Sequence, residues 1–336
     1  MNASLEQLNT LRIATQSEQL INITDIDQLK NIFLNHDAYP HPFLILGSGS
    51  NLVLSQDFPG TVLHIQIKGI EIISEDTDTV TLSISAGEVW DQLVGYCVDK
   101  GYYGLENLSG IPGTVGAAPV QNIGAYGVEL EQLLVSVDAM EISTGEMRTL
   151  LHKQCEFGYR DSVFKSRLAG HYVITGVKLT LQKNPRSTTN LNYKGLESEF
   201  EKRGLIDPDP STVRGAIKEI RYSKLPDLSV LPNAGSFFKN PIITEDNYIQ
   251  LLEKYPEIIS FDLGGGQIKL AASWMIEKAG WKGFREGDAG VFEQHALIIV
   301  NHGQATGSEI LTLAGRIQNS VFNKFGVPLE IEPVVI

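Results

Sequence analysis

A short glycine-rich turn, LGSGSN at residues 46–51, is the first segment whose residue types could do chemistry. Its glycines and serines can direct several backbone N–H groups at one anion, which is typical of phosphate sites. The turn lacks the third glycine and the following helix of a dinucleotide-binding GxGxxG sequence, and no GxxxxGK[ST] loop occurs elsewhere. By itself it is compatible both with a phosphate site and with a tight structural turn.

A second unusual segment runs from Gly101 to Gly127 and reads GYYGLENLSGIPGTVGAAPVQNIGAYG. So much glycine is incompatible with a regular helix or a central strand. The segment is almost uncharged and contains Ile111, Val115, Val120 and Ile123. We therefore expect a buried loop that lies against a flat ligand, and a long surface loop is the alternative.

The elements before residue 184 must position these two segments. Residues 24–36 predict a helix capped by Thr24 or Asp25, and residues 90–100 predict a helix closed by Gly101. Apolar runs and period-two alternation predict strands at 43–46, 52–54, 61–67, 80–86, 135–142, 146–150 and 171–181. Strands, helices and glycine loops in this order favour an α+β fold.

The pattern breaks near residues 184–187 and at the DPDPS cluster of 207–211, where we place a domain boundary. A helix capped by Ser211 or Thr212 should follow. Its apolar side and an adjacent basic stripe are formed by Val213, Ile217 and Ile220, and by Arg214, Lys218 and Arg221. We interpret the stripe, taken alone, as an ordinary solvated helix face. Further on we expect a helix at 268–279, a strand at 296–301 and a helix at 308–325.

Composition limits the class of protein. A chain of 336 residues, 42% hydrophobic and 20% charged, is long enough for about two domains and excludes a coiled coil or wholesale disorder. The run Ala296–Val300 is far shorter than the ~20 apolar residues of a membrane span, and the polar N-terminus lacks a secretory signal. Cys97 and Cys155 form no disulfide or zinc pattern. We expect a cytoplasmic protein.

The formal charge of −13 comes from 27 basic and 40 acidic residues, which argues against a nucleic-acid footprint over the whole surface. The first hundred residues hold 4 basic and 13 acidic residues. Positive groups are therefore available mainly in the later part of the chain, where they could bind an anionic ligand.

Four motifs occur in one order: LGSGSN, the glycine-rich segment, GYRDSVFK at 158–165 and NAGSFFKNP at 233–241. Together they resemble the UDP-N-acetylenolpyruvoylglucosamine reductase family, from NTL at 9–11 to LEIE at 329–332. The resemblance implies a two-lobed FAD-binding domain of the vanillyl-alcohol-oxidase (PCMH) type at 1–183, with lobes of about 1–67 and 68–183. It also implies an inter-domain segment at 184–210, an α+β substrate-binding domain at 211–327, and a C-terminal strand at 328–336 that returns to the active site.

The same resemblance implies FAD as cofactor and NADPH as electron donor. The turn at 47–51 is similar to the family's pyrophosphate turn, and the loop from 111 to 126 to the wall of its FAD site. Glycine suits both segments, because a side chain would hold the backbone away from the cofactor. Tyr126 could stack on a ring of FAD or cap the protein core. The residues expected at the cofactor are Gly47, Ser48, Gly49, Ser50, Asn51, Ile111, Pro112, Gly113, Thr114, Gly116, Ala117, Asn122, Gly124 and Tyr126.

Three residues resemble the family's catalytic set: Arg160, Ser236 and Glu332. Hydride addition to the terminal carbon of an enolpyruvyl ether pushes negative charge onto the neighbouring carbon and its carboxylate. Arg160 offers a planar fork for that carboxylate, a protonated Glu332 could donate to it, and Ser236 could protonate the carbon. Without the resemblance, an arginine beside Asp161 usually forms a surface ion pair, and a serine after Ala-Gly usually lies in a turn.

Tyr193, Lys224 and Asn240 resemble substrate-contacting residues, with Lys224 near a diphosphate, and the tyrosine-bearing insertion is typical of the family's longer class. This chain departs from the family pattern at Leu11, where phenylalanine is common, and at Pro333, which follows Glu332. The second departure leaves Glu330 as an alternative to Glu332.

The resemblance thus implies an NADPH-dependent UDP-N-acetylmuramate dehydrogenase, which acts through FAD in peptidoglycan precursor synthesis. A flavin oxidase or dehydrogenase of the same fold and a non-catalytic nucleotide-sugar binding protein are the alternatives. We expect a monomer that binds a small UDP-sugar enolpyruvyl ether, and neither nucleic acid nor a membrane nor a metal.

Overall fold

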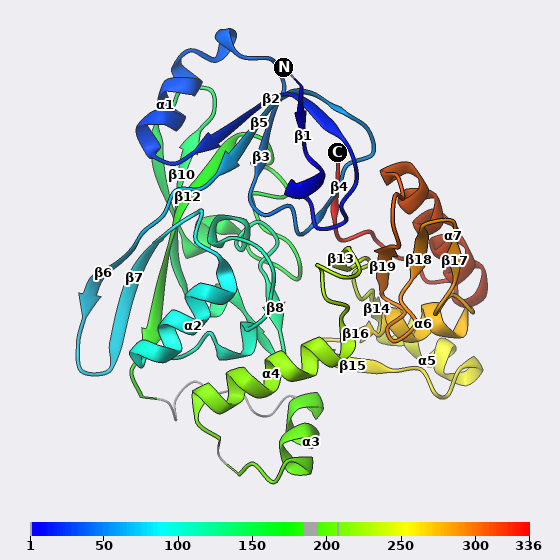
Figure 1. Cartoon of the computed structure of the whole chain (residues 1–336). Helices are drawn as coiled ribbons and strands as arrows, with labels where there is room; N and C mark the ends of the chain where they lie inside the picture. The colour runs from blue at the N-terminus through cyan, green and yellow to red at the C-terminus, as the bar shows by residue number, and fades with distance from the viewer. Residues whose placement is uncertain (1, 185–193, 207) are drawn as a thin grey trace. The chain divides into compact units, whose positions relative to one another are not determined.

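The computed structural model describes residues 2–184, 194–206 and 208–336, and for residues 194 and 195 the backbone alone (Figure 1). The chain divides into two compact units. Unit 1 contains Met1–Asn2, Glu18–Ser48 and Pro59–Arg221, and unit 2 contains Ala3–Ser17, Gly49–Phe58 and Tyr222–Ile336.

The larger sheet of unit 1 has five antiparallel strands. In spatial order they are β11 (Met147–Leu151), β10 (Leu134–Glu141), β12 (Tyr172–Gln182), β7 (Thr79–Ser85) and β6 (Ile70–Glu75). Val177 of β12 pairs with Ile84 on one side and with Val137 on the other, so the middle of the sheet is apolar. Four of the strands confirm the predicted ones. The sequence did not predict β6, because most of its side chains are exposed and show no period-two burial.

A smaller sheet of unit 1 carries the glycine-rich turn at the end of one strand. It contains β2 (Gln16–Ile23), β5 (Phe58–Ile65) and β3 (Phe43–Leu46), with β3 parallel to β5. Helix α1 (Ile26–Leu34) begins after Asp25, whose side chain accepts the N–H of Gln28. The predicted helix and strands of this region are confirmed.

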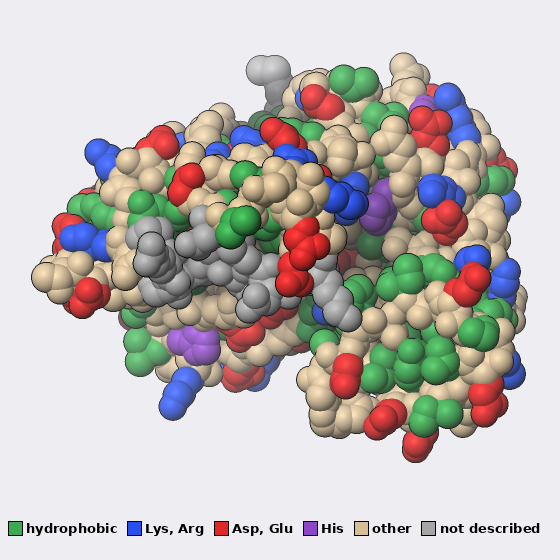
Figure 2. Space-filling model, turned by 90° about the horizontal axis from the view of Figure 1, so that it is seen from below, with side chains coloured by type: hydrophobic (Ala, Val, Ile, Leu, Met, Phe, Trp, Pro, Cys, Tyr) green, Lys and Arg blue, Asp and Glu red, His purple; other side chains and the backbone are tan. Residues whose placement is uncertain are grey.

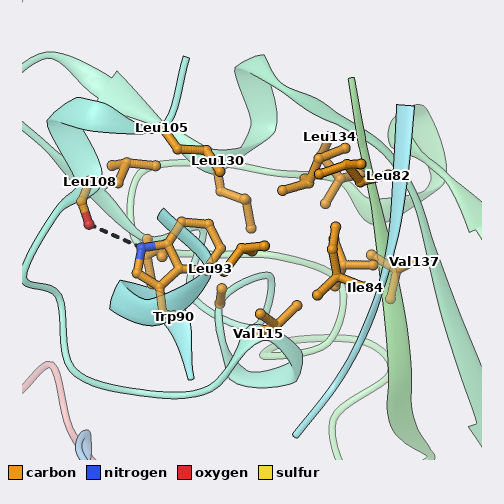
Figure 3. Close-up of a cluster of buried hydrophobic side chains, with 14 of the residues drawn as sticks. Leu82, Ile84, Trp90, Leu93, Leu105, Leu108, Val115, Leu130, Leu134 and Val137 are labelled. Atoms are coloured by element: carbon orange, nitrogen blue, oxygen red, sulfur yellow. Dashed lines mark hydrogen bonds between the residues drawn. The ribbon is translucent and has the colours of Figure 1, made fainter. Parts of the chain in front are cut away.

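Helix α2 (Trp90–Lys100) packs its apolar side into the main core of unit 1, as Figure 3 shows. Trp90 lies among leucines from the neighbouring loop, and its Nε1–H donates to Leu108 O at 3.0 Å (Figure 3). Each fully buried large aliphatic side chain in such a core contributes about 1.5–3 kcal/mol. The helix ends as predicted at Gly101, which adopts φ 76°.

Helices α3 (Lys194–Lys202) and α4 (Pro210–Lys224) form a second small core of unit 1. As predicted, Val213, Ile217 and Ile220 are buried in α4. The predicted cap at Ser211 or Thr212 is wrong, because the carboxylate of Asp209 accepts the N–H groups of both residues.

Unit 2 contains two sheets of three or four strands, a two-stranded pair and three α-helices. One sheet has the order β13 (Asn233–Ser236), β19 (Ile298–Asn301), β18 (Ala289–Val291), β17 (Arg285–Glu286), and the other has β14 (Ile242–Thr244), β16 (Gln267–Leu270), β15 (Ser260–Gly264). The helices are α5 (Glu245–Lys254), α6 (Ala272–Lys278) and α7 (Gly307–Phe325). The helix predicted at 268–279 is wrong in its first residues, because Ile268 and Lys269 belong to β16 and are paired on both sides.

Segments from both ends of the chain complete unit 2. Asn233 N donates to Thr10 O at 3.0 Å, and Asn301 Nδ2 donates to Leu11 O at 2.8 Å. The terminal strand β20 (Val334–Val335) pairs in parallel with β4 (Leu52–Val53), and β1 (Ala3–Ser4) pairs with Gln16 and Ser17. The units therefore differ from the expected domains: residues 3–17 and 49–58 belong with the C-terminal part, and most of α4 belongs with unit 1.

Seen from below, basic side chains are dispersed among acidic and hydrophobic ones on the face shown in Figure 2. No helix in the described residues is long and apolar enough to cross a membrane. Within the same residues, no cluster of three or more histidine, cysteine, aspartate or glutamate side chains could hold a metal ion.

Candidate active site

The turn after β3 presents backbone donors that the protein itself does not use. In the described part of the chain, the N–H groups of Gly47, Ser48 and Gly49 donate to no protein acceptor. Gly49 O instead accepts the N–H of Thr10 at 3.1 Å, and Asn51 O accepts that of Val334 at 3.0 Å. Ser50 lies between them, half-buried. Consecutive N–H groups of this kind form an anion-binding concavity, as phosphate recognition requires.

Packing within the protein, rather than the expected approach of a cofactor, directly requires glycine at two positions of the turn. A Cβ atom at Gly49 would lie 2.0 Å from Leu8 O, and Gly49 has φ 61°. A Cβ at Gly47 would lie 2.5 Å from Thr114 Oγ1. Both positions therefore require glycine because the chain packs against itself there. The expected reason, that a side chain would hold the backbone away from the cofactor, did not include this packing within the protein.

The second segment lies against the first through Thr114 and is fixed to the start of α2. Trp90 N donates to Gly113 O at 3.1 Å, and Val115 N to Glu88 O at 2.9 Å. Gly116 N donates to Ala86 O at 2.9 Å, and a Cβ at Gly116 would lie 2.6 Å from Ala86 Cβ. These bonds fix the loop to the segment before α2, and its regular structure near Gly113 is the short 3-10 turn Val115–Ala117.

The glycine-rich loop, like the turn, has backbone N–H groups that no protein atom accepts in the described residues. Gly113 has φ 134°, and within the described residues the N–H groups of Gly113 and Thr114 have no protein acceptor. Pro112 and Ala117 are exposed beside them, and Ile111 packs partly buried on the main core. The loop is buried as predicted, since Val115 and Ile123 belong to that core. Five unused N–H groups on two glycine-rich segments that meet at Thr114 fit a dinucleotide such as FAD.

Asn122, expected at the cofactor, is fully buried and serves the fold. Its Nδ2 donates to Glu129 Oε2 at 3.0 Å and to Gly158 O at 3.2 Å, and its Oδ1 accepts Glu131 N at 3.1 Å. Its amide thereby ties the glycine-rich loop to the turn that carries Arg160. Its φ of 44° is a left-handed conformation that asparagine tolerates.

Arg160 occupies a tight turn in which Gly158 and Asp161 exchange two backbone hydrogen bonds of 3.1 Å. Its Nη2 donates to Gly124 O at 2.9 Å, and a Cβ at Gly124 would lie 3.1 Å from its Nη1. Arg160 also lies over the ring of Tyr159, 5.2 Å from the ring centroid. The structure thus brings Arg160 to the glycine-rich loop, 36 residues away in sequence.

Strained backbone gathers at these positions. Among the residues that the structure describes, five non-glycine residues have positive φ, and three of them, Asn122, Tyr126 and Arg160, lie in or beside the loop. Each such conformation costs about 1–3 kcal/mol and persists only where the surroundings enforce it, commonly at functional sites. Tyr126, whose backbone O accepts Asn107 Nδ2 at 3.0 Å, packs on the α3–α4 core, which agrees with the core-capping alternative.

In unit 2, Ser236 and Glu332 lie on adjacent segments of backbone. Ser236 ends β13 after a bulge that includes Gly235, which has φ 70°. Phe238 pairs with Ile331, and Glu332 N donates to Phe237 O at 3.0 Å. Glu332 is half-buried, whereas Glu330 is exposed and pairs with Lys239. This register favours Glu332 over Glu330 as the residue near Ser236.

Comparison with known proteins agrees with this geometry. Residues 17–151 match the FAD binding domain family, and residues 226–336 match the C-terminal domain of UDP-N-acetylenolpyruvoylglucosamine reductase. The reductase of Chromobacterium violaceum is 43% identical over 100% of this chain and 98% of its own, and that of Alcanivorax borkumensis is 44% identical over 100% and 95%. This chain belongs to the UDP-N-acetylenolpyruvoylglucosamine reductase family.

A crystal structure of the UDP-N-acetylenolpyruvylglucosamine reductase (MurB) from Thermus caldophilus matches with a TM-score of 0.70 and 25% identity, covering 100% of this chain and 98% of that one. The predicted α+β fold, the FAD-binding domain and the membership of this reductase family are thereby confirmed.

The three residues expected to bind the substrate of this reductase differ in what the structure shows of their surroundings. Lys224 is exposed at the end of α4. The side-chain oxygen of Asn240 accepts Ala272 N at 3.0 Å, so this residue caps α6. Tyr193 lies outside the described residues.

The sequence did not single out His295 and Asp91, two residues of the reductase with notable surroundings. Burial, and then the charges of Lys224 and Lys282, lower the pKa of His295, so its ring is neutral at neutral pH. Asp91 binds two residues of the basic stripe, so the interpretation of that stripe as a solvated face is wrong. His295 is an isolated histidine and Asp91 lies in the first turn of α2, so neither residue belongs to a sequence pattern that predicts these surroundings.

Proposed function

We propose that this reductase converts UDP-N-acetyl-3-O-(1-carboxyvinyl)glucosamine to UDP-N-acetylmuramate with NADPH as reductant, the second committed step of peptidoglycan precursor synthesis. The observation that carries the roles of its residues is the register of unit 2, in which Glu332 N binds Phe237 O and follows the strand of Ser236. FAD, when bound, would supply the hydride transfer from NADPH to the substrate. The turn at 47–49 and the loop at 113–114 would hold it through their unused N–H groups.

The protein's own groups act on the other end of the double bond. The hydride adds to the terminal carbon, and the electron pair of the C=C bond moves toward the neighbouring carbon and its carboxylate. Arg160 is to bind that carboxylate with its planar guanidinium, and a protonated Glu332 is to donate to it. Ser236 then gives its hydroxyl proton to the neighbouring carbon, which completes the saturated lactyl ether.

Stopped-flow half-reactions test this function. We expect NADPH to bleach the bound flavin, and the enolpyruvyl substrate to restore its colour faster than oxygen does. Faster reoxidation by oxygen would instead indicate a flavin oxidase, and a colourless protein after incubation with FAD would indicate a nucleotide-sugar binding protein. Either result would overturn the proposed function.

The role of Ser236 is tested in the same experiment. Ser236→Ala should leave flavin reduction by NADPH nearly unchanged, and should slow reoxidation by substrate about a hundredfold or more, the range expected for loss of a positioned proton donor. Ser260→Ala is a matched control, because Ser260 is also a half-buried strand serine of unit 2, bonded to Tyr248 Oη at 2.9 Å. Equal slowing of both half-reactions by Ser236→Ala would show a structural role.

The remaining proposals concern location and assembly. We propose that the protein acts as a cytoplasmic monomer on a small UDP-sugar, without a nucleic-acid partner. Its net charge of −13 supports the last point.

A further inference from the structure

One carboxylate of unit 1 joins the cofactor loop to a distant helix. Asp91 Oδ1 accepts Gly110 N at 2.7 Å and Arg214 Nη1 at 2.6 Å, and Oδ2 accepts Lys218 Nζ at 3.0 Å. Arg214 Nη2 also donates to the backbone O of Asp91 at 3.1 Å. A residue in the first turn of α2 is therefore bound both to the glycine-rich loop and to α4, more than 120 positions further along the chain.

The carbonyl group of Gly110 is bound by a residue of α4. Arg221 Nε donates to Gly110 O at 3.2 Å. Gly110 has φ 70°, and a Cβ there would lie 3.3 Å from Arg221 Cδ. Both polar groups of Gly110 are thus occupied, its N–H by Asp91 and its carbonyl by Arg221.

Two further bonds from Trp90 fix the loop on either side of Gly110. Trp90 Nε1 donates to Leu108 O at 3.0 Å, as Figure 3 shows, and Trp90 N donates to Gly113 O at 3.1 Å. Gly113 and Thr114, which carry unused N–H groups, follow directly. The direction of these donors therefore depends on the path of the chain through Gly110.

The Asp91 cluster is stronger than an ordinary surface ion pair, which is worth about 0–1 kcal/mol. Burial opposes ionisation of Asp91. Hydrogen bonds from Arg214, Gly110 and Lys218 outweigh burial and hold the pKa of this carboxyl well below its usual range. Asp91 is therefore a fixed anion at neutral pH.

We propose that Asp91 is a positioning residue for the cofactor: by binding Gly110 and α4 together, it sets the loop conformation in which Gly113 and Thr114 present their N–H groups to FAD. This inference rests on the proposed function, since FAD is the ligand of the loop. It also makes α4 part of the support of the cofactor site, although α4 need not touch the cofactor.

Asp91→Asn tests the proposal, because asparagine keeps the shape and loses the charge that binds Arg214 and Lys218. Asp138→Asn is a matched control in unit 1. Asp138 forms an ion pair with Lys178 at 2.8 Å, and its side chain is 21% exposed against 26% for Asp91. Asp138 also accepts hydrogen bonds from Thr149 Oγ1 and Thr175 Oγ1, on strands of the large sheet.

We expect Asp91→Asn to raise the dissociation constant of FAD about tenfold or more, measured by flavin fluorescence on titration of the apoprotein, a change of about 1.4 kcal/mol. Asp138→Asn should change it by less than about twofold. Both dissociation constants are measured well below the melting temperature of each apoprotein, which separates positioning of the loop from general stability. Equal FAD dissociation constants in the two variants would overturn the proposal.

Arg214→Lys keeps the test decisive should Asp91→Asn fail to fold. Lysine retains the charge but loses the two-pronged donation to Asp91, so a smaller rise in the FAD dissociation constant is expected. Wild-type affinity in this variant would overturn the proposal. A wild-type protein that binds no FAD would overturn the proposed function itself. If NADPH reduces FAD normally in the wild type and the variants keep the wild-type affinity for FAD, the proposed function stands and only the role of Asp91 is overturned.

Discussion

The backbone N–H of Glu332 donates to the carbonyl oxygen of Phe237 at 3.0 Å, so the last residues of the chain run beside the segment that follows Ser236. This bond places the backbone of Glu332 beside Phe237, the residue that follows Ser236. Glu330, two residues earlier, is exposed and pairs with Lys239.

The first prediction follows from this register. Glu332→Ala should reduce enolpyruvate reduction by about a hundredfold or more, as expected for loss of a donor to the developing charge. Glu332→Gln should retain more activity, because its amide can still donate. Glu330→Ala should be nearly neutral, because it removes only an exposed ion pair. Steady-state kcat measurements check all three, and a damaging Glu330→Ala beside a harmless Glu332→Ala would transfer the role to Glu330.

The second prediction concerns the two glycines of the turn. Gly49→Ala should destabilise the apoprotein by about 2–5 kcal/mol, because its Cβ meets the Leu8 carbonyl and its φ is positive. Gly47→Ala should cost about 1–3 kcal/mol, because its Cβ meets only the Thr114 side chain. Denaturant unfolding of the apoproteins measures both losses.

A second substitution provides the control for this pair. Thr114→Ala should recover most of the stability lost in Gly47→Ala, because it removes the atom in contact, and should not help Gly49→Ala. Equal recovery in both backgrounds would contradict the packing explanation of these glycines.

The third prediction separates two roles of Asn240. Asn240→Ala should cost about 0.5–2 kcal/mol, because α6 loses a side-chain acceptor at Ala272 N. Asn240→Asp keeps the acceptor and should keep the stability, yet its added negative charge should raise KM for a diphosphate substrate. Unfolding and KM measurements on the same two variants test this. A wild-type KM in Asn240→Asp would show that Asn240 serves the fold alone.

The fourth prediction concerns a buried carboxyl group beneath the loop. Burial raises the pKa of Glu106, and the N–H of Gly104, which its carboxylate accepts, only partly offsets this. Above the ordinary pKa of 4.5 the unfolded chain loses this proton first. The free energy of unfolding should therefore fall as the pH rises from 4.5 through the raised pKa.

Glu106→Gln should remove this contribution, because glutamine does not titrate. Urea unfolding between about pH 4.5 and 7 should give a flatter pH dependence in the variant than in the wild type. The same slope in both proteins would show that Glu106 ionises alike in the folded and unfolded chain.

The sequence predicted those helices whose apolar face and capping residue lie close together in the chain. Helices α1, α2 and α7 combine an apolar face with a cap close in sequence, as with Thr306 and Glu309 at the start of α7. Strand β6 was missed because its side chains are mostly exposed, and Ile268 was assigned to a helix because apolar residues on a short strand and on a helix look alike.

The long motifs predicted the family, which the comparisons confirm. The roles of the site residues stay predictions, and the packing that requires glycine at positions 47 and 49 could not be predicted from the sequence. The atoms that require glycine there, Leu8 O and Thr114 Oγ1, are remote in sequence. Asp91 was missed for the same cause, since its partners Arg214 and Lys218 looked like a solvated stripe when taken alone.

The pairing of β20 with β4 has a consequence for synthesis of the protein. A growing chain emerges N-terminus first, and domains usually fold in that order. Unit 2, however, contains both Ala3–Ser17 and the strand Val334–Val335, so its earliest residues must wait until that strand has been translated. A fragment that starts at Pro226 has no Leu52 or Val53 for β20 to pair with. We therefore expect unit 2 to complete its fold only after Val334 and Val335 have left the ribosome.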